Sequence, residues 1–206
     1  TFSHHITYSH TFHFILTYSI LTHIMSFQSF NIWSHLLGFF LFFALLIWAL
    51  NTWLADAAPS ERLAFIVFAV SVQIQMLAST IFHWFGCMGK TTYSVVAKLD
   101  YTGIAVMIVG SYYPMIYYFF LCQPFWMVFY MVVVALLGFL TLSVSWLPWF
   151  QAPQYSTFRA LLFIALGCAV VIMLPHFLSL DPTPWGCAFR LAVMGGMYIA
   201  GAVCAW

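Results

Sequence analysis

Charge is what this chain lacks most. Only 4% of its 206 residues are charged and 65% are hydrophobic, and the mean hydropathy is +1.03. A soluble domain carries about 25% charged residues, so a chain this poor in charge does not cover itself for water. We therefore predict an integral membrane protein, an all-α polytopic bundle whose first partner is the lipid bilayer.

Three further absences exclude other classes. The net charge of +1 gives no basic surface for nucleic acid, and no Gly-rich phosphate loop or dinucleotide fingerprint occurs. The five cysteines form no Cys-x-x-Cys pair, which argues against a cysteine-based zinc knuckle. A disulfide between Cys122 and Cys187 and free apolar cysteines within the bundle both stay open.

Long apolar runs are abundant. A helix needs about 20 apolar residues to cross the hydrocarbon core, and six runs meet that length. They span residues 32–54, 63–85, 101–121, 125–147, 158–180 and 187–206. We expect Pro114 to kink the third run, and Pro175 to do the same in the fifth. The aromatic residues between 112 and 120 are expected to form a belt that faces lipid and the membrane–water interface.

The few basic residues predict the orientation. Alternating sides place Lys90, Lys98 and Arg159 on one side of the membrane, and Arg62 and Arg190 on the other. Because basic residues concentrate on the cytoplasmic side, this split favours a cytoplasmic N-terminus.

Residues 1–30 are treated apart from the membrane domain, residues 31–206. They hold five histidines among Ser, Thr, Tyr and Phe, and they have no signal-peptide pattern. An interfacial helix around residues 12–25, a disordered segment and a weak metal site are the alternatives.

Polar side chains gather at one membrane side. Ser79 and His83 lie four residues apart at the end of the second run, and such residues share a helix face. Asp100 opens the third run on the same side. Polar groups at that depth are costly and usually mark a functional site. The simpler alternatives are an N-cap role for Asp100, a bond from Ser79 to its own i−4 carbonyl, and a carbonyl partner for His83.

Two more histidines fall within the predicted spans. His35, at the start of the first run, is interpreted as a packing or interfacial residue. His176, in the fifth run, is expected at the opposite end of the bundle from His83, where the two rings do not share a metal.

Three stretches carry a family resemblance. They are Asn-Ile-Trp-Ser-His-Leu-Leu-Gly at 31–38, Ser-Thr-Ile-Phe-His at 79–83, and Lys-Leu-Asp-Tyr-Thr-Gly-Ile at 98–104. In this order they resemble the progestin and adipoQ receptor family, which includes the adiponectin receptors and the hemolysin III proteins. Residues 174–177 and 197–201 look like the fifth and sixth spans of that family. The resemblance extends over residues 27–206.

The resemblance implies a seven-helix fold with a zinc site. It makes His83 the metal ligand, with two further ligands from a His-x-x-x-His motif in a seventh span. Asp100 would orient a metal-bound water and Ser79 would support the site, and these two are the candidate catalytic residues. The 206 residues contain no His-x-x-x-His, so we expect six spans and an incomplete zinc site. A partial gene product and a six-span relative are the two explanations left open.

The function implied by the resemblance is membrane reception. We expect a receptor of the adiponectin or progestin type, in the plasma membrane or Golgi, that binds a hormone or lipid and a signalling protein. One alternative is a Golgi scaffold that tethers kinases. The other is a zinc-dependent, ceramidase-like hydrolase of lipid amides, in which zinc supplies the nucleophilic water.

Overall fold

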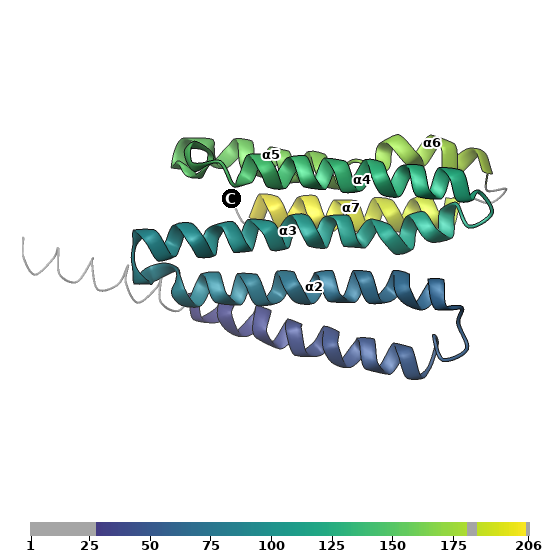
Figure 1. Cartoon of the computed structure of the whole chain (residues 1–206), viewed down its shortest axis with the longest axis horizontal. Helices are drawn as coiled ribbons and strands as arrows, with labels where there is room; N and C mark the ends of the chain where they lie inside the picture. Colours follow the sequence, from purple (N-terminus) through teal and green to yellow (C-terminus); the bar gives the residue numbers. More distant parts are fainter. Residues whose placement is uncertain (1–27, 181–184, 205–206) are drawn as a thin grey trace, which may run out of the picture.

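The computed structural model describes residues 28–180 and 185–204 as a bundle of long helices (Figure 1). The part of the chain that it describes contains no strand. The first helix is Gln28–Asn51, followed by α2, Pro59–Phe85, and α3, Lys90–Phe119. The later helices are α4, Pro124–Ser145; α5, Ser156–Gly167; α6, Val170–Leu180; and α7, Trp185–Cys204. Short 3₁₀ turns occupy Gly86–Met88, Pro148–Gln151 and Pro153–Tyr155.

Proline and glycine define several helix ends. Pro59 and Pro124 are the first residues of α2 and α4, where the missing N–H costs nothing because that position has no helical acceptor. The side chain of Glu61 accepts a hydrogen bond from the backbone N–H of Ala58, at 3.3 Å, and caps α2. Gly89 separates α2 from α3 with φ 139°, a backbone conformation that disfavours side chains with a Cβ.

The helix lengths confirm the predicted all-α membrane fold. Five segments of the described residues are long and apolar enough to cross a membrane: Gln28–Asn51, Pro59–Met88, Lys90–Phe119, Pro124–Ser145 and Pro153–Leu180. The sixth predicted run corresponds to α7, whose apolar stretch Phe189–Gly201 is shorter. The chain is therefore a multi-pass membrane protein. Residues 1–27, which include the proposed interfacial segment, lie outside the described residues.

The start of the third span was predicted wrongly. We expected residues 101–121, whereas α3 already begins at Lys90 and runs for 30 residues. Lysine is a good helix former, so Lys90 and Lys98 mark the edge of the apolar segment and do not end the helix. Asp100 is consequently an interior helix residue, so the alternative of an N-cap role for Asp100 is wrong.

The fifth span is one apolar segment but two helices. It breaks at Cys168 and Ala169, before the proline at 175, which lies inside α6. The hydroxyl of Tyr112, from α3, lies at the break. It donates to the carbonyl of Gly167 at 2.5 Å and accepts from the N–H of Val170 at 3.1 Å. The Tyr112 hydroxyl therefore pairs two backbone groups that the break in the helix leaves without helical partners. Such pairing is needed in a membrane, where no water can replace it.

Close contact between α2 and α3 is made through two glycines of α3. Gly103 and Gly110 on α3 face Gln75 and Ser71 on α2. A Cβ at Gly103 would lie 3.0 Å from the Cα of Gln75, so glycine is what lets the two backbones approach. Small residues at such crossings are typical of helix pairs in membranes.

The main apolar core lies toward the other end, between α3, α4 and α6. Its buried members are Tyr112, Ile116, Phe120, Tyr130, Val134, Ala169, Met173 and Phe177. Tyr112, Tyr117 and Phe120 are all buried, so the predicted lipid-facing aromatic belt is wrong for these three side chains. Tyr112 and Phe120 belong to this core, where the rings of Phe119 and Phe177 stack 3.7 Å apart, and the hydroxyl of Tyr117 meets that of Ser60 on α2 at 2.8 Å.

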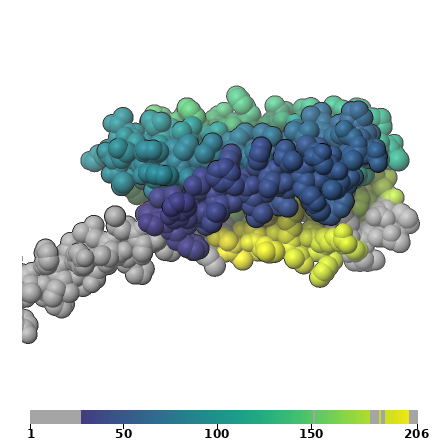
Figure 2. Space-filling view, turned by 90° about the horizontal axis from the view of Figure 1, so that it is seen from below, coloured from purple at the N-terminus to yellow at the C-terminus, as the bar shows by residue number. Residues whose placement is uncertain are grey.

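The outer helices are the most exposed part of the bundle. None of residues 28–51 is fully buried, and Figure 2 shows this first helix on one face with α7 along its border. Apolar side chains on such helices suit contact with lipid. Cys122 is a free, exposed thiol, so it does not form the disulfide with Cys187 that the sequence left possible. The side chain of Cys187 lies outside the described residues.

Candidate functional site

The predicted polar residues lie where α2 ends and α3 begins, at the left end of the bundle in Figure 1. Ser79 is buried on α2, and its hydroxyl interacts with the carboxyl group of Asp100 on α3. Gln75, one turn before Ser79, interacts with the same carboxyl group. The structure therefore brings Ser79 and Asp100 together, as their positions on the two helices predicted.

Asp100 is held in an unusual environment for a carboxylate. It lies eleven residues into α3, flanked by the α2 side chains of Ser79 and Gln75. Its Oδ1 atom is buried and has no hydrogen-bond partner among the described residues, as is also true of Oε1 of Gln75. A buried polar atom without a partner costs about 1–3 kcal/mol, so such atoms call for a functional explanation.

His83 lies one turn beyond Ser79 and pairs with a residue from the first helix. The centroids of the His83 and His35 rings are 5.7 Å apart. Nδ1 of His83 contacts Oε1 of Gln28 at 2.6 Å, and Nδ1 of His35 contacts the carbonyl oxygen of Asn31 at 2.7 Å. Since both partners are oxygen atoms, Nδ1 is the donor in each contact, and Nε2 would be the acceptor nitrogen of a neutral ring.

Two members of this polar cluster were not predicted. Gln75 could have been found, because Gln75, Ser79 and His83 follow each other at intervals of four and share one helix face. His35 was interpreted as a packing residue. Its contact with His83 depends on how the first helix crosses α2, which no local pattern contains.

The residues present fit part of a metal site. His83 offers an Nε2 lone pair, and the unpartnered oxygen of Asp100 suits a water-linked carboxylate. Zinc is normally held by three or four protein ligands. Within residues 28–180 and 185–204, no group of three His, Cys, Asp or Glu side chains is placed to hold one ion. The described residues therefore supply fewer ligands than zinc normally takes.

Basic and aromatic residues surround this end of the bundle. The indole N–H of Trp146 donates to the hydroxyl of Thr102 at 2.9 Å, and Nζ of Lys98 lies 5.8 Å from the Trp146 ring. Arg159 lies 5.4 Å from the ring of Tyr101 and donates to the carbonyl of Phe150 at 2.6 Å. These contacts tie α3 to the connection between α4 and α5, next to Asp100.

His176 lies at the opposite end, as predicted. Its ring packs edge-on against Trp126, with centroids 4.8 Å apart, and its Nδ1 lies 3.1 Å from the hydroxyl of Tyr130. These partners belong to the start of α4, far along the bundle from His83. His176 is therefore not part of the polar cluster.

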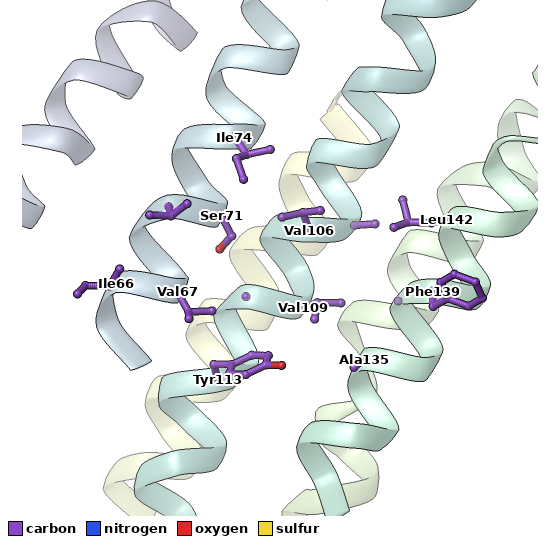
Figure 3. Close-up of a pocket in the computed structure, with 14 residues that line it drawn as sticks. Ile66, Val67, Ser71, Ile74, Val106, Val109, Tyr113, Ala135, Phe139 and Leu142 are labelled. Carbon is purple, nitrogen blue, oxygen red and sulfur yellow. The ribbon is translucent and has the colours of Figure 1, made fainter. Parts of the chain in front are cut away.

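A separate apolar cavity of about 510 Å³ lies midway along α2, α3 and α4 (Figure 3). Ile74 and Ser71 from α2, Val106 and Tyr113 from α3, and Phe139 from α4 are among its lining residues. Ser71 precedes Ser79 by eight residues, which is about 12 Å along a helix. The cavity thus lies away from Asp100 and does not include the polar cluster.

Known proteins resemble this chain over most of its length. The family model described as Haemolysin-III related matches residues 25–204. The chain belongs to this family. Relatives include Heptahelical transmembrane protein 1 of Arabidopsis thaliana, 34% identical over 166 residues, and the Adiponectin receptor protein of Drosophila melanogaster, 31% identical over 182 residues. Progestin and adipoQ receptor family member 3 of Homo sapiens is 32% identical over 162 residues.

The extent of these matches limits what they imply. They cover 77%, 84% and 77% of this chain but 49%, 40% and 52% of the three relatives. The chain thus spans about half of the length of the relatives that it matches. The resemblance to the progestin and adipoQ receptor family is confirmed, and the chain is a multi-pass membrane protein of a receptor family.

Proposed function

We propose that this chain is the membrane domain of a receptor of the adiponectin or progestin type, with a metal-centred polar site at the α2–α3 end. Reception is supported by the names of two relatives, an adiponectin receptor protein and a progestin and adipoQ receptor family member. The observation that carries the site is the contact of Ser79 and Gln75 with Asp100, inside a bundle that is otherwise apolar. Polar groups that a membrane protein keeps at such depth usually serve its function.

Each residue of the site has a distinct role in this proposal. His83 would hold the metal through Nε2, with Nδ1 donating to the side-chain oxygen of Gln28. Asp100 would orient a water molecule with its unpartnered oxygen and could accept a proton from that water. Ser79 and Gln75 fix the rotamer of Asp100. When bound, zinc supplies Lewis acidity and a water of lowered pKa.

Ligand binding to cell membranes tests reception directly. Membranes from cells that express the full chain are compared with vector-only membranes, using labelled progesterone and labelled adiponectin as separate probes. Saturable extra binding of one probe supports the proposal. Equal binding by both membranes, with the protein shown to be folded, contradicts reception by either probe class.

Replacement of His83 separates the metal role from reception. In cells that respond to a bound probe, His83→Ala should abolish the response if the metal is part of the site. The matched control is His176→Ala, at the opposite end of the bundle, which should leave the response intact. A response that survives His83→Ala argues against the metal role and leaves reception standing.

The scaffold and hydrolase alternatives make different predictions. A scaffold would retain kinase co-localisation in the Golgi after His83→Ala, and plasma-membrane residence would count against it. A lipid amidase would release fatty acid from ceramide, and Asp100→Asn would stop the release. Lack of turnover by metal-loaded protein would exclude it.

The basic residues support a cytoplasmic N-terminus for this receptor. The α2–α3 end of the bundle holds Lys90, Lys98 and Arg159, whereas Arg62 lies near the start of α2, at the opposite end. The polar site would then face the cytoplasmic half of the membrane. Antibody access to tags placed at residues 87–89, with and without permeabilisation of the cells, tests this orientation.

A further inference from the structure

We infer that the bundle binds an anionic phospholipid, with one acyl chain in the apolar cavity between α2, α3 and α4 and the headgroup at Lys98. Two separate features carry this inference. The cavity suits a hydrocarbon chain, and no carboxylate neutralises the lysine at the end of the same helix face. The lipid site lies apart from the polar cluster and does not depend on the metal role of His83.

The cavity is open toward the bilayer (Figure 3). Its volume of about 510 Å³ lies within the range of ligand pockets. Among its lining residues, Ile74 is 44% exposed and Phe139 is 70% exposed, so the opening is on the outer surface of the helices. Because an empty space forfeits van der Waals contacts, an acyl chain from the surrounding bilayer is favoured inside it.

The lining of the cavity favours hydrocarbon over polar ligands. Of its fourteen residues only Ser71 and Tyr113 are polar. The hydroxyl of Ser71 already donates to the carbonyl of Phe68 at 2.7 Å. Since a buried polar group without a partner costs free energy, a ligand rich in polar groups is disfavoured here. The part of the ligand that enters the cavity is therefore a chain.

The helix faces that line the cavity continue toward Lys98. On α3, Lys98, Thr102 and Val106 follow each other at intervals of four and share one face, and Val106 lines the cavity. On α4, Trp146 follows the lining residue Leu142 by four. The indole N–H of Trp146 donates to the hydroxyl of Thr102, and Nζ of Lys98 lies 5.8 Å from the Trp146 ring. A lysine thus lies at the end of the surface that α3 and α4 form together.

The distance along α3 suits a single phospholipid. Tryptophan side chains are enriched at the level of the headgroups, so the contact with Trp146 indicates that Lys98 lies at that level. Val106 follows Lys98 by eight residues, which is about 12 Å along a helix. The hydrocarbon of one leaflet is about 15 Å thick, half of the whole core. A lipid whose headgroup contacts Lys98 therefore has its chains at the depth of the cavity.

No carboxylate of the described residues forms an ion pair with Lys98. The acidic side chains that the structure describes are Asp56, Glu61 and Asp100. The first two lie at the opposite end of the bundle, and Asp100 interacts with Ser79 on α2. An anionic headgroup would supply the missing partner. The proposed cytoplasmic orientation of this end agrees with that partner, because anionic lipids give the cytoplasmic leaflet its negative surface potential.

Native mass spectrometry of the lipid-bound protein tests the inference. The full chain is purified in detergent, stripped of lipid and titrated with phosphatidylserine or with phosphatidylcholine that carries the same acyl chains. We expect the protein to bind one phosphatidylserine about fivefold more tightly, which is the contribution of one basic residue at a membrane surface. Glycerophosphoserine, the same headgroup without chains, should not displace the lipid at equal concentration.

Replacement of Lys98 tests the headgroup contact. Lys98→Gln should make the affinities for the two lipids equal, whereas Lys98→Arg keeps the charge and should keep the preference. The matched control is Lys90→Gln, which removes an exposed charge eight residues earlier in α3 and should also keep the preference. Helical circular dichroism shows whether each variant is folded.

A bulky side chain in the cavity tests the chain contact. Ala135→Trp, in the lining on α4, should weaken the binding of both lipids by about tenfold, which corresponds to lost contact with about two methylene groups. Leu136→Trp places the same ring on the neighbouring residue, which is exposed and does not line the cavity. This control should bind both lipids as the wild type does.

Four results would overturn the inference. Equal affinity of the wild type for both lipids, or a preference that survives Lys98→Gln, means that Lys98 binds no headgroup. Unchanged binding by Ala135→Trp means that no chain occupies the cavity. Displacement by glycerophosphoserine means that the site holds a free anion. Each result leaves the ligand-binding assay for reception unaffected, so failure of this inference is distinguishable from failure of the proposed receptor function.

Discussion

Replacement of Gly110 by alanine is expected to separate α2 from α3. A Cβ at this position would lie 2.5 Å from the Cβ of Ser71 and 3.5 Å from the carbonyl oxygen of Val67. Because real Cβ atoms do not approach so closely, the two backbones must move apart. Overfilling a packed interior costs about 1–3 kcal/mol. Alanine also gains about 1 kcal/mol of helix propensity over glycine.

A matched control removes the propensity contribution. Gly196, on α7, has no atom of the described residues within 4 Å of where its Cβ would lie. Gly196→Ala therefore gains propensity without a clash. The free energy of unfolding of Gly110→Ala should be lower than that of Gly196→Ala by about 1–3 kcal/mol, which is about 5- to 150-fold in the equilibrium constant.

Reversible unfolding in mixed micelles measures this difference. The chain has nine tryptophans, so fluorescence can follow unfolding as the fraction of denaturing detergent rises. Ser71→Gly, combined with Gly110→Ala, removes the clashing Cβ and should restore at least half of the lost free energy. Equal stability of the Gly110→Ala and Gly196→Ala variants would refute the close packing of α2 against α3.

Two further changes test other contacts of the bundle. Tyr112→Phe removes the hydroxyl that the N–H of Val170 donates to, and should lower the free energy of unfolding by about 1–3 kcal/mol in the same micelle titration; an unchanged midpoint would mean that the break in the fifth span is satisfied otherwise. Arg159→Gln removes the charged donor to the carbonyl of Phe150, and should speed proteolysis within residues 148–155 without unfolding the bundle. Cleavage at the wild-type rate would show that this contact does not hold the connection between α4 and α5.

Hydropathy was sufficient to predict the helices but not all of their ends. Long apolar runs are typical of helices that cross a membrane, and all six predicted runs correspond to helical segments of the structure. The start of α3 at Lys90 was missed because charge marks the membrane edge, whereas a helix continues through lysine. The break after Gly167 depends on the hydroxyl of Tyr112, which comes from a distant helix. No local pattern contains such a contact.

The polar site divides in the same way. Helix periodicity placed Ser79 and His83 on one face, and the same rule applied to Gln75 would have added it. The position of Asp100 opposite Ser79 was predicted, although its place inside α3 was not. The pairing of His35 with His83 is set by the crossing of two helices. A sequence pattern within one helix cannot predict this contact between two helices.

The zinc content of the purified chain tests the central claim most directly. Wild-type protein, His83→Ala and His176→Ala are equilibrated with the same micromolar Zn²⁺, separated from free ion and analysed for zinc per chain. Because one site accounts for the polar cluster, we expect His83→Ala to lower the bound zinc by about one ion per chain. His176→Ala should match wild type. Equal zinc in all three proteins would contradict a metal site at the α2–α3 end.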